Sequence, residues 1–367
     1  MAFTKHWVSH PWDPSSRSQE SAIIALNLAN DYGPKERQDE YYDWQYRRNP
    51  AGPAVIRLAV DERDSDKLAG IYVVIPIDLV CRGETVSAAL SLNTLTDANY
   101  RRQRIFTELA QETYDLCAER GLHAVVGYPN PNSYPGFVKR LGFRDIGDIP
   151  LLLRALSPSR ILEKKLPVAG LRRALGRVTS YGDRLFQVRS RSDAGVETLD
   201  EFDSGFDEFG DHLAGRFPLL VKRSAAFLNW RYLDHPFDYR VLVVRDAGLV
   251  SGFIAYRCVP FADMQCGMIL DFAVRGSSAG SRAGLRLLRA ALAEMTSREC
   301  DLVGALALPH TAENALLRRS GFLPCPAKLK PQPFPYIVRK NTTGFDFGLD
   351  VFDIQNWFVA IGDYDAA

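Results

Sequence analysis

The sequence predicts a mixed α/β fold built from two similar domains. Three observations support this: β-prone apolar runs alternate with helical patterns, the second half repeats motifs of the first, and 367 residues suffice for two domains. Hydrophobic residues make up 46% of the chain, which is enough for two packed cores. We expect residues 1–155 to form domain 1, residues 156–191 a basic linker segment, and residues 192–367 domain 2.

Hydrophobic periodicity gives the order of elements in domain 1. An irregular arm at residues 1–15 comes first, and a turn is expected at 61–67. The expected elements are helices over 16–31 and 36–48, strands over 55–60, 71–80 and 88–95, a helix closed by Gly121, a strand over 122–127, a short helix, and a last strand after Gly142-Phe143. The tyrosines and the tryptophan of the second helix are typical of a core or an interface.

Several short motifs recur in the second half in the same order. Asp43-Trp44-Gln45-Tyr46 recurs as Asn229-Trp230-Arg231-Tyr232, and Arg140-Leu141-Gly142-Phe143 recurs as Arg319-Ser320-Gly321-Phe322. Leu68-Ala69-Gly70 recurs as Val250-Ser251-Gly252. The offset drifts slowly, as small loop deletions produce, so we infer two copies of one domain.

Composition excludes several classes of protein. A net charge of +1 argues against a nucleic-acid binder. Six cysteines form no CxxC pair and the histidines have no metal-ligand spacing, so no metal site is expected. The start of the chain is polar and the best apolar run, 69–80, is too short to span a bilayer. We therefore expect a cytoplasmic protein.

A cluster of cations stands at the start of the third helix of domain 1. Arg101-Arg102-Gln103-Arg104 follows a β-prone run and a polar turn, and the helical pattern begins at Ile105. The free amides and the dipole of a helix N-terminus favour an anion. This stretch therefore predicts an anion site.

The stretch from Ser87 to Phe143 resembles the GCN5-related N-acetyltransferase (GNAT) superfamily, and the tandem layout resembles its two-domain bacterial members. In that family a strand enters an Arg/Gln-x-x-Gly-x-Gly/Ala loop whose amides hold the pyrophosphate of acetyl-CoA. Here Arg104 and Phe106 stand at the two glycine positions. Arg104 either lends its guanidinium to a phosphate or marks a decayed site.

The resemblance implies two mixed central sheets flanked by helices, acetyl-CoA or another acyl-CoA as cosubstrate, and no metal. The strand 93–96 would supply backbone groups to the pantetheine and thioester. The residues that the resemblance places on the cofactor are Leu95, Thr96, Arg101, Arg102, Gln103, Arg104, Ile105, Phe106, Asn130 and Asn132. The two asparagines equally fit as caps of the following helix.

Two residues are candidates for catalysis. The family often places a tyrosine four residues before the final glycine as the acid for the thiolate, but that position is Val138 here, and Tyr134 is the nearest substitute or a turn residue. In domain 2, Asp271 lies in an apolar strand over 268–274; it is either a general base or amine anchor, or a paired core residue. The loop over 275–282 lacks the Arg-x-x-Gly spacing, so domain 1 is the expected cofactor domain and domain 2 the degenerate, substrate-shaping or structural one.

The resemblance implies an N-acyltransferase that moves acetyl from acetyl-CoA to the amine of a small molecule or amino sugar by direct attack in a ternary complex. A non-catalytic scaffold with degenerate loops is the alternative. Segment 156–191 carries basic and apolar faces, so it either touches an anionic membrane peripherally or packs across both domains. After an expected strand over 357–361, Asp363 and Asp365 either reach a substrate cleft or belong to a solvated tail.

Overall fold

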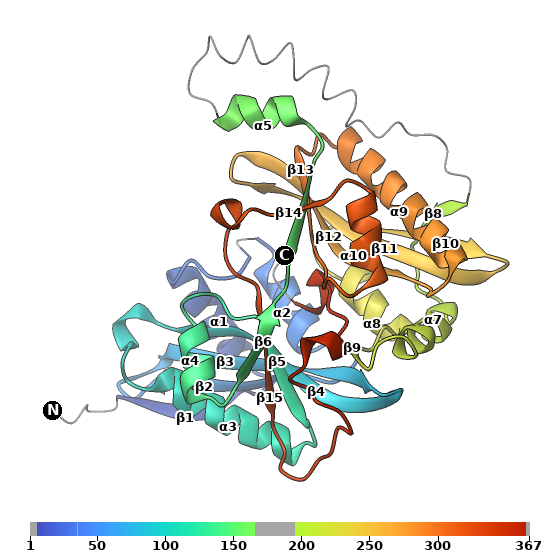
Figure 1. Ribbon diagram of the computed structural model, residues 1–367. Helices are drawn as coiled ribbons and strands as arrows, with labels where there is room; N and C mark the ends of the chain where they lie inside the picture. The colour runs from blue at the N-terminus through green and yellow to red at the C-terminus, as the bar shows by residue number, and fades with distance from the viewer. Residues whose placement is uncertain (1–5, 35, 166–194, 365–367) are drawn as a thin grey trace.

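Two mixed β-sheets, each flanked by helices, make up the protein (Figure 1). The structure is a computed structural model that describes residues 6–34, 36–165 and 195–364. The first sheet has the strand order β1-β2-β3-β4-β5-β15-β6, with β9 paired to β3, and the second has the order β14-β7-β13-β12-β11-β10-β8. The mixed α/β fold expected from the sequence is confirmed.

The bounds of the elements are as follows. The first sheet contains β1 (Trp7–Pro11), β2 (Val55–Asp61), β3 (Asp64–Cys81), β4 (Glu84–Thr96), β5 (Ala124–Gly127), β6 (Arg144–Asp148), β9 (Leu219–Val221) and β15 (Pro335–Lys340). The second contains β7 (Leu151–Ala155), β8 (Val196–Thr198), β10 (Arg240–Asp246), β11 (Leu249–Phe261), β12 (Met264–Val274), β13 (Leu302–Leu306) and β14 (Leu323–Pro324). The helices are α1 (Arg17–Ala29), α2 (Gln38–Tyr46), α3 (Ile105–Glu119), α4 (Tyr134–Arg140), α5 (Pro158–Lys165), α7 (Gly205–Ala214), α8 (Ala225–Leu228), α9 (Ser278–Ser297) and α10 (Ala312–Arg319), with short turns η1 (Ala98–Tyr100), η2 (Asn229–Leu233), η3 (Ala327–Leu329), η4 (Ile354–Asn356) and η5 (Ile361–Asp363).

The same series of elements occurs twice. The series β2-β3-β4-α3-β5-α4-β6 corresponds to β10-β11-β12-α9-β13-α10-β14. In both series the strand before the long helix pairs in parallel with the strand after it, β4 with β5 and β12 with β13. We call α1 to β6 the first repeat and α7 to β14 the second repeat. This arrangement fits the tandem layout expected from the sequence.

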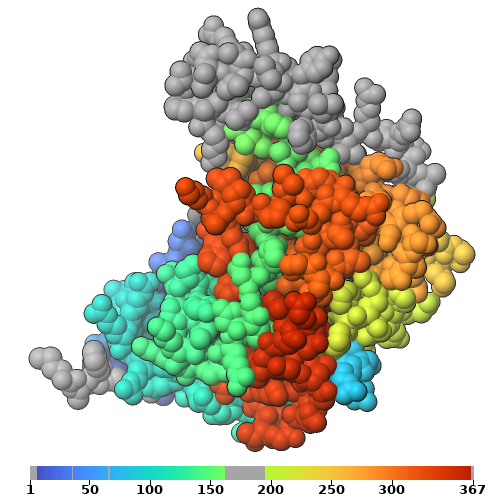
Figure 2. Space-filling view, viewed as in Figure 1, coloured from blue at the N-terminus to red at the C-terminus, as the bar shows by residue number. Residues whose placement is uncertain are grey.

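The two sheets exchange strands. β7 follows β6 in the chain but lies in the second sheet between β13 and β14. β15 follows the second repeat but lies in the first sheet between β5 and β6. Figure 2 shows the green part of the chain continuing upward among orange residues of the second repeat. Each sheet therefore contains one strand from the other expected domain: β7 lies in the second sheet and β15 in the first. The domain boundaries expected at residues 155 and 192 stay a prediction.

The recurring tryptophans of the two repeats contact each other. The Trp44 and Trp230 rings stack with centroids 4.7 Å apart and planes 13° apart. The Nε1 of Trp44 donates to the carbonyl oxygen of Trp230 at 2.6 Å, and the Nε1 of Trp230 donates to that of Trp44 at 3.0 Å. This reciprocal contact is what a pseudo-twofold axis through the pair would produce. Trp44 of α2 therefore belongs to an interface between the repeats.

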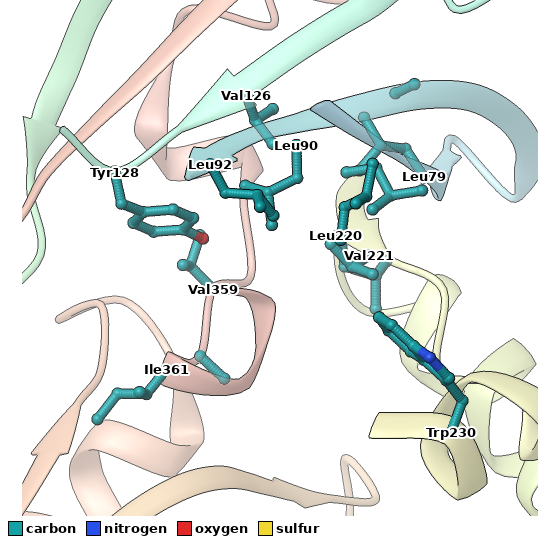
Figure 3. Packing of buried hydrophobic residues seen from close by; sticks show 14 of the residues in the cluster. Leu79, Leu90, Leu92, Val126, Tyr128, Leu220, Val221, Trp230, Val359 and Ile361 are labelled. Carbon is teal, nitrogen blue, oxygen red and sulfur yellow. The ribbon is translucent and has the colours of Figure 1, made fainter. Parts of the chain in front are cut away.

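A large apolar cluster fills the space between the repeats. Figure 3 shows Leu90, Leu92 and Val126 of β4 and β5 near Val221 of β9 and Val359 of the C-terminal segment. These side chains are all nearly inaccessible to solvent. Because the hydrophobic contribution grows with the apolar area removed from water, this shared core favours one cooperative unit.

Two expectations about the ends of the chain are wrong. Residues 7–11 form β1, which pairs with β2, instead of an irregular arm. Its signal is weak because the short run WVSHP shows no alternation of apolar and polar residues. Residues 357–361 form no strand; Trp357 makes an isolated bridge to Leu219, and the chain then enters η5.

The basic linker segment is described only in part. Its start forms α5, where the guanidinium of Arg160 binds Asp301 at 2.6 Å. Residues 166–194 lie outside the described residues, so the two interpretations of this segment stay predictions. Within the described ranges, no helix is both long enough and apolar enough to cross a membrane.

Candidate functional site

The N-terminus of α3 presents three exposed arginines. Arg101, Arg102 and Arg104 precede a helix of 15 residues, and all three are exposed. The N-cap residue Arg104 makes no side-chain hydrogen bond to the first turn. The first amides of a helix have no acceptor within the helix, and its dipole is positive at this end. This helix start therefore has the positive charge that an anion would need, and the anion site stays a prediction.

The loop keeps the backbone conformation that glycine would give it. Arg104 has a φ of 64° and Arg102 a φ of 67°, both in the left-handed region. This conformation is unfavourable for a residue with a Cβ. The departure from glycine at Arg104 therefore falls on a residue whose backbone conformation favours glycine.

Neighbouring elements hold the loop in place. The Nε1 of Trp7 on β1 donates to the carbonyl oxygen of Gln103 at 3.3 Å. The buried Tyr100 donates its hydroxyl to the Asp61 carboxylate at the end of β2. This bond is the main reason that the pKa of Asp61 falls to about 2. β1 and β2 thus fix the position of the four-residue loop.

Phe106 fills space between α3 and α4. Its ring centroid lies 5.4 Å from that of Phe137 and 5.8 Å from that of Tyr72. A Cβ added to Gly136 would lie 2.6 Å from Phe106 Cε1, so glycine is needed on α4 at this contact. The second glycine position of the family loop is thereby occupied by an aromatic ring.

The end of β4 leaves its parallel partner. β4 pairs with β5 at Ala89, Leu90 and Ser91, but β5 ends at Gly127 while β4 continues to Thr96. A bulge interrupts the pairing of β4 with β3 in this part, and Asn93 has a φ of 46° there. Leu95 and Thr96 therefore lie on a strand that has diverged from β5 and leads into the arginine loop.

Polar side chains of α2 contact this diverging strand. The Nδ2 of Asn93 donates to Oε1 of Gln45 and, at 3.0 Å, to the hydroxyl of Tyr46. Gln45 and Tyr46 are almost completely buried. Composition and periodicity gave no sign of these contacts, although both residues belong to a motif that recurs between the repeats.

The candidates on α4 are engaged locally. The Oδ1 of Asn130 accepts from the amides of Asn132 and Ser133, both at 3.0 Å, in a turn that precedes α4 and its N-cap residue Ser133. The hydroxyl of Tyr134 donates to Oδ2 of Asp145 at 2.6 Å. That hydrogen bond is the main reason that the pKa of Tyr134 is raised. Asn130 thus stabilises the turn before α4, and neither asparagine is the N-cap residue of that helix.

The corresponding helix start in the second repeat is already capped. The Oγ of Ser277 accepts from the amide of Gly280 at 3.0 Å, and Nε2 of His212 accepts from the amide of Gly276 at 3.0 Å. Burial, with the nearby Arg275 and Arg216, lowers the pKa of His212, which favours the neutral acceptor. The loop over 275–282 therefore uses amide donors that a ligand would need.

An ion pair covers the end of β12. Arg216 donates from Nη1 to Oε1 of Glu313 at 2.9 Å and also to the carbonyl oxygen of Val274. The same Glu313 oxygen accepts from the amide of Val274 at 3.2 Å. Both backbone groups of Val274 are thus bound internally. The matching position in β4 is Thr96, because Gly70 faces Thr96 as Gly252 faces Val274.

Asp271 lies in a buried ionic cluster between the repeats. Its Oδ2 accepts from Nε of Arg223 and from the hydroxyl of Tyr232, both at 3.1 Å, and its Oδ1 has no hydrogen-bond partner among the described residues. Nη1 of Arg223 also lies 2.5 Å from Oδ1 of Asp363. Burial outweighs the attraction of Arg223 and raises the pKa of Asp363. Asp271 also lines a small cavity of about 20 Å³ beside β12 and β13.

The structure keeps the two catalytic candidates apart. Tyr134 contacts Asp145 on the outer part of the first repeat, whereas Asp271 contacts side chains of the second repeat. Arg223 was missed from the sequence, although an arginine after the apolar run LLV was a signal for it. Asp363 is a buried group in the cluster, and Asp365 lies outside the described residues.

Comparison with known proteins identifies the first repeat. The family model of the acetyltransferase (GNAT) domain matches residues 18–146, from α1 into β6. Residues 18–146 form a GNAT domain. A search of curated proteins found no match.

Solved structures share the fold over both repeats. A GCN5-related N-acetyltransferase from Anabaena variabilis has a TM-score of 0.62 and 14% identity, covering 91% of this chain and 73% of that one. Saccharomyces cerevisiae N-myristoyltransferase with bound myristoyl-CoA has a TM-score of 0.63 and 13% identity, covering 93% of this chain and 80% of that one. An Enterococcus faecalis protein described as a probable N-acyltransferase has a TM-score of 0.59 and 11% identity, covering 91% of this chain and 72% of that one. The whole chain therefore has a GNAT-type fold.

Proposed function

We propose that the protein is an acyl-CoA-dependent N-acyltransferase whose first repeat binds the cofactor. The pyrophosphate would lie at the start of α3, against Arg101 and Arg104. The pantetheine would follow the diverging end of β4 past Leu95 and Thr96. Acetyl-CoA is the donor we propose first, and the acceptor is the amine of a small molecule such as an amino sugar.

The contrast between the two helix starts carries the proposal. The start of α3 has three exposed arginines and an N-cap without a side-chain hydrogen bond. At the start of α9, Ser277 and His212 already accept from backbone amides. A phosphate needs both positive charge and available donors. Of the two, the α3 start supplies this combination better.

The strand ends support the same assignment. In the second repeat, Arg216 and Glu313 bind the carbonyl and amide of Val274. A pantetheine could pair with that strand end only by displacing a nearly buried ion pair, which would leave its charges uncompensated. In the first repeat, the diverging end of β4 leads directly to the arginine loop.

The reaction would be a direct transfer. The amine nitrogen attacks the thioester carbonyl carbon, and a tetrahedral intermediate forms. The C–S bond then breaks and the thiolate leaves. The nitrogen loses one proton and the sulfur gains one. The polar groups of Asn93, Gln45 and Tyr46 lie beside the bulge in β4. They are the candidates for orienting the acceptor. Asp271, fixed by Arg223, is proposed as a structural ion-pair partner.

A non-catalytic binding protein is the second candidate, and Phe106 favours it. Its ring packs on α4 at a position where the family has a small residue. The same ring could narrow the path of the cofactor without closing it. Turnover decides between the two functions.

The test is an assay of CoA thiol release with acetyl-CoA and a panel of amines that includes amino sugars. The proposal expects thiol release that depends on one class of amine and falls in the Arg101→Ala/Arg104→Ala variant. Acetyl-CoA binding without release for any amine, with longer acyl-CoA donors equally inactive, would favour the non-catalytic candidate.

A further inference from the structure

Two cysteines from distant parts of the second repeat lie side by side. The Sγ atoms of Cys258 on β11 and Cys300 before β13 are 3.4 Å apart. They are 42 positions apart in the chain, so the fold alone creates the contact. Cys258 is partly exposed and Cys300 is buried. An oxidant in solvent can therefore reach one sulfur while the other remains protected.

The surroundings favour a division of roles between these thiols. Cys300 donates its S–H to Cys258, and this hydrogen bond is the main cause that lowers the pKa of Cys258. The same contact, with burial, raises the pKa of Cys300. A thiolate reacts with peroxides much faster than a thiol does. Cys258 is thus suited to react first, and Cys300 to follow.

We propose that Cys258 and Cys300 form a dithiol that a peroxide converts to a disulfide. The Cys258 thiolate attacks the peroxide, whose O–O bond breaks, and becomes a sulfenic acid as water leaves after protonation. The sulfur of Cys300 then attacks the Cys258 sulfur, an S–S bond forms, and a second water leaves. In total, two thiols and one hydrogen peroxide give one disulfide and two waters.

The bond would affect the base of α5. The carbonyl oxygens of Glu299 and Cys300 accept from Nη2 of Arg160 at 2.8 and 3.1 Å, and the next residue, Asp301, binds Nε of Arg160. A disulfide shortens the sulfur separation to about 2.05 Å, so the side chains must move at the residue whose carbonyl oxygen Arg160 binds. The state of the dithiol is thereby coupled to the anchor of the basic linker.

The test treats the folded, fully reduced protein with hydrogen peroxide. We expect the loss of two of the six thiols, a mass decrease of about 2 Da for the two hydrogens, and a peptide that links Cys258 to Cys300. The midpoint of thermal unfolding should rise by roughly 5 °C, because the link restricts the unfolded chain. Added thiol should restore the starting values.

Variants separate this pair from ordinary oxidation. Cys258→Ser and Cys300→Ala should each abolish the linked peptide, and Cys325→Ser, at a partly exposed cysteine outside the pair, should leave it unchanged. Circular dichroism checks that each variant is folded, and Cys258→Ser at the more exposed position gives a decisive result if Cys300→Ala unfolds. Oxidation of Cys258 to sulfinic acid without a link, a link to Cys266, or no loss of thiols would each overturn the proposal.

Discussion

At the scale of single residues, the arginine loop adopts a backbone conformation that its amino-acid types disfavour. Arg104 takes a φ of 64° where the family has glycine. The sequence shows the arginine but not its φ, so decay and retention of the loop could not be separated there. Asp271 shows the same limit: its apolar neighbours along the strand indicate burial, but Arg223, 48 positions away, is a partner that only the fold supplies.

His235 gives a prediction at this scale. Burial lowers its pKa to about 2, and its ring packs 4.1 Å from that of Trp44. In the unfolded chain the pKa is near 6.5, so below that pH the unfolded state binds a proton that the folded state does not. Stability should therefore be fully present above pH 6.5 and fall by about 2 kcal/mol between pH 6.5 and pH 5. Denaturant unfolding at several pH values measures this.

The matched variant for this pH effect is His235→Asn. It should be less stable at every pH and should lose most of the additional fall below pH 6.5. An equal fall in the wild type and in His235→Asn would show that another group is responsible.

At the scale of elements, the sequence predicted the helices and strands with strong periodicity. It did not predict which strands from distant parts of the chain pair in one sheet. Helices α1, α2 and α3 were expected within a few residues of their observed bounds. The exchange of β7 and β15 between the sheets was not expected, because an apolar run indicates a strand without indicating which sheet the strand joins. The strand expected over 357–361 is wrong because those apolar side chains pack into the shared core without a ladder.

The recurring glycines at the sheet–helix contacts allow a paired prediction. A Cβ on Gly70 would lie 2.9 Å from the Leu95 carbonyl oxygen and 2.8 Å from Ile105, and one on Gly252 would lie 2.9 Å from the Ala273 carbonyl oxygen. Gly70→Ala and Gly252→Ala should each destabilise the protein by about 1–3 kcal/mol. Only Gly70→Ala should also weaken acetyl-CoA binding, since Ile105 begins α3. Thermal unfolding and calorimetry measure the two effects, and equal loss of binding in both would count against a first-repeat site.

At the scale of the whole molecule, the exchanged strands make the repeats dependent on each other. β15 lies between β5 and β6 in the first sheet, and β7 lies between β14 and β13 in the second. A strand missing from inside a sheet leaves backbone donors and acceptors without partners. The stacked Trp44 and Trp230 bury further apolar area at the contact between repeats.

We therefore expect that neither half folds alone. Residues 1–165, which lack β15, should show no cooperative unfolding transition, and the same holds for residues 195–367, which lack β7. Co-expression of both pieces should restore a soluble complex, while the intact chain should unfold in one transition. Circular dichroism and size-exclusion chromatography are the measurements. A folded monomer of residues 1–165 would contradict the interdependence.

The most direct test of the central claim is calorimetric titration with acetyl-CoA. If the α3 start holds the pyrophosphate, the wild type binds and Arg101→Ala/Arg104→Ala weakens binding by roughly 2–4 kcal/mol, about 30- to 900-fold, from the loss of charge-assisted hydrogen bonds. Arg282→Ala is the matched control, because Arg282 is an exposed arginine at the start of α9. Unchanged affinity in the folded double variant, or an equal loss in Arg282→Ala, would contradict a cofactor site in the first repeat.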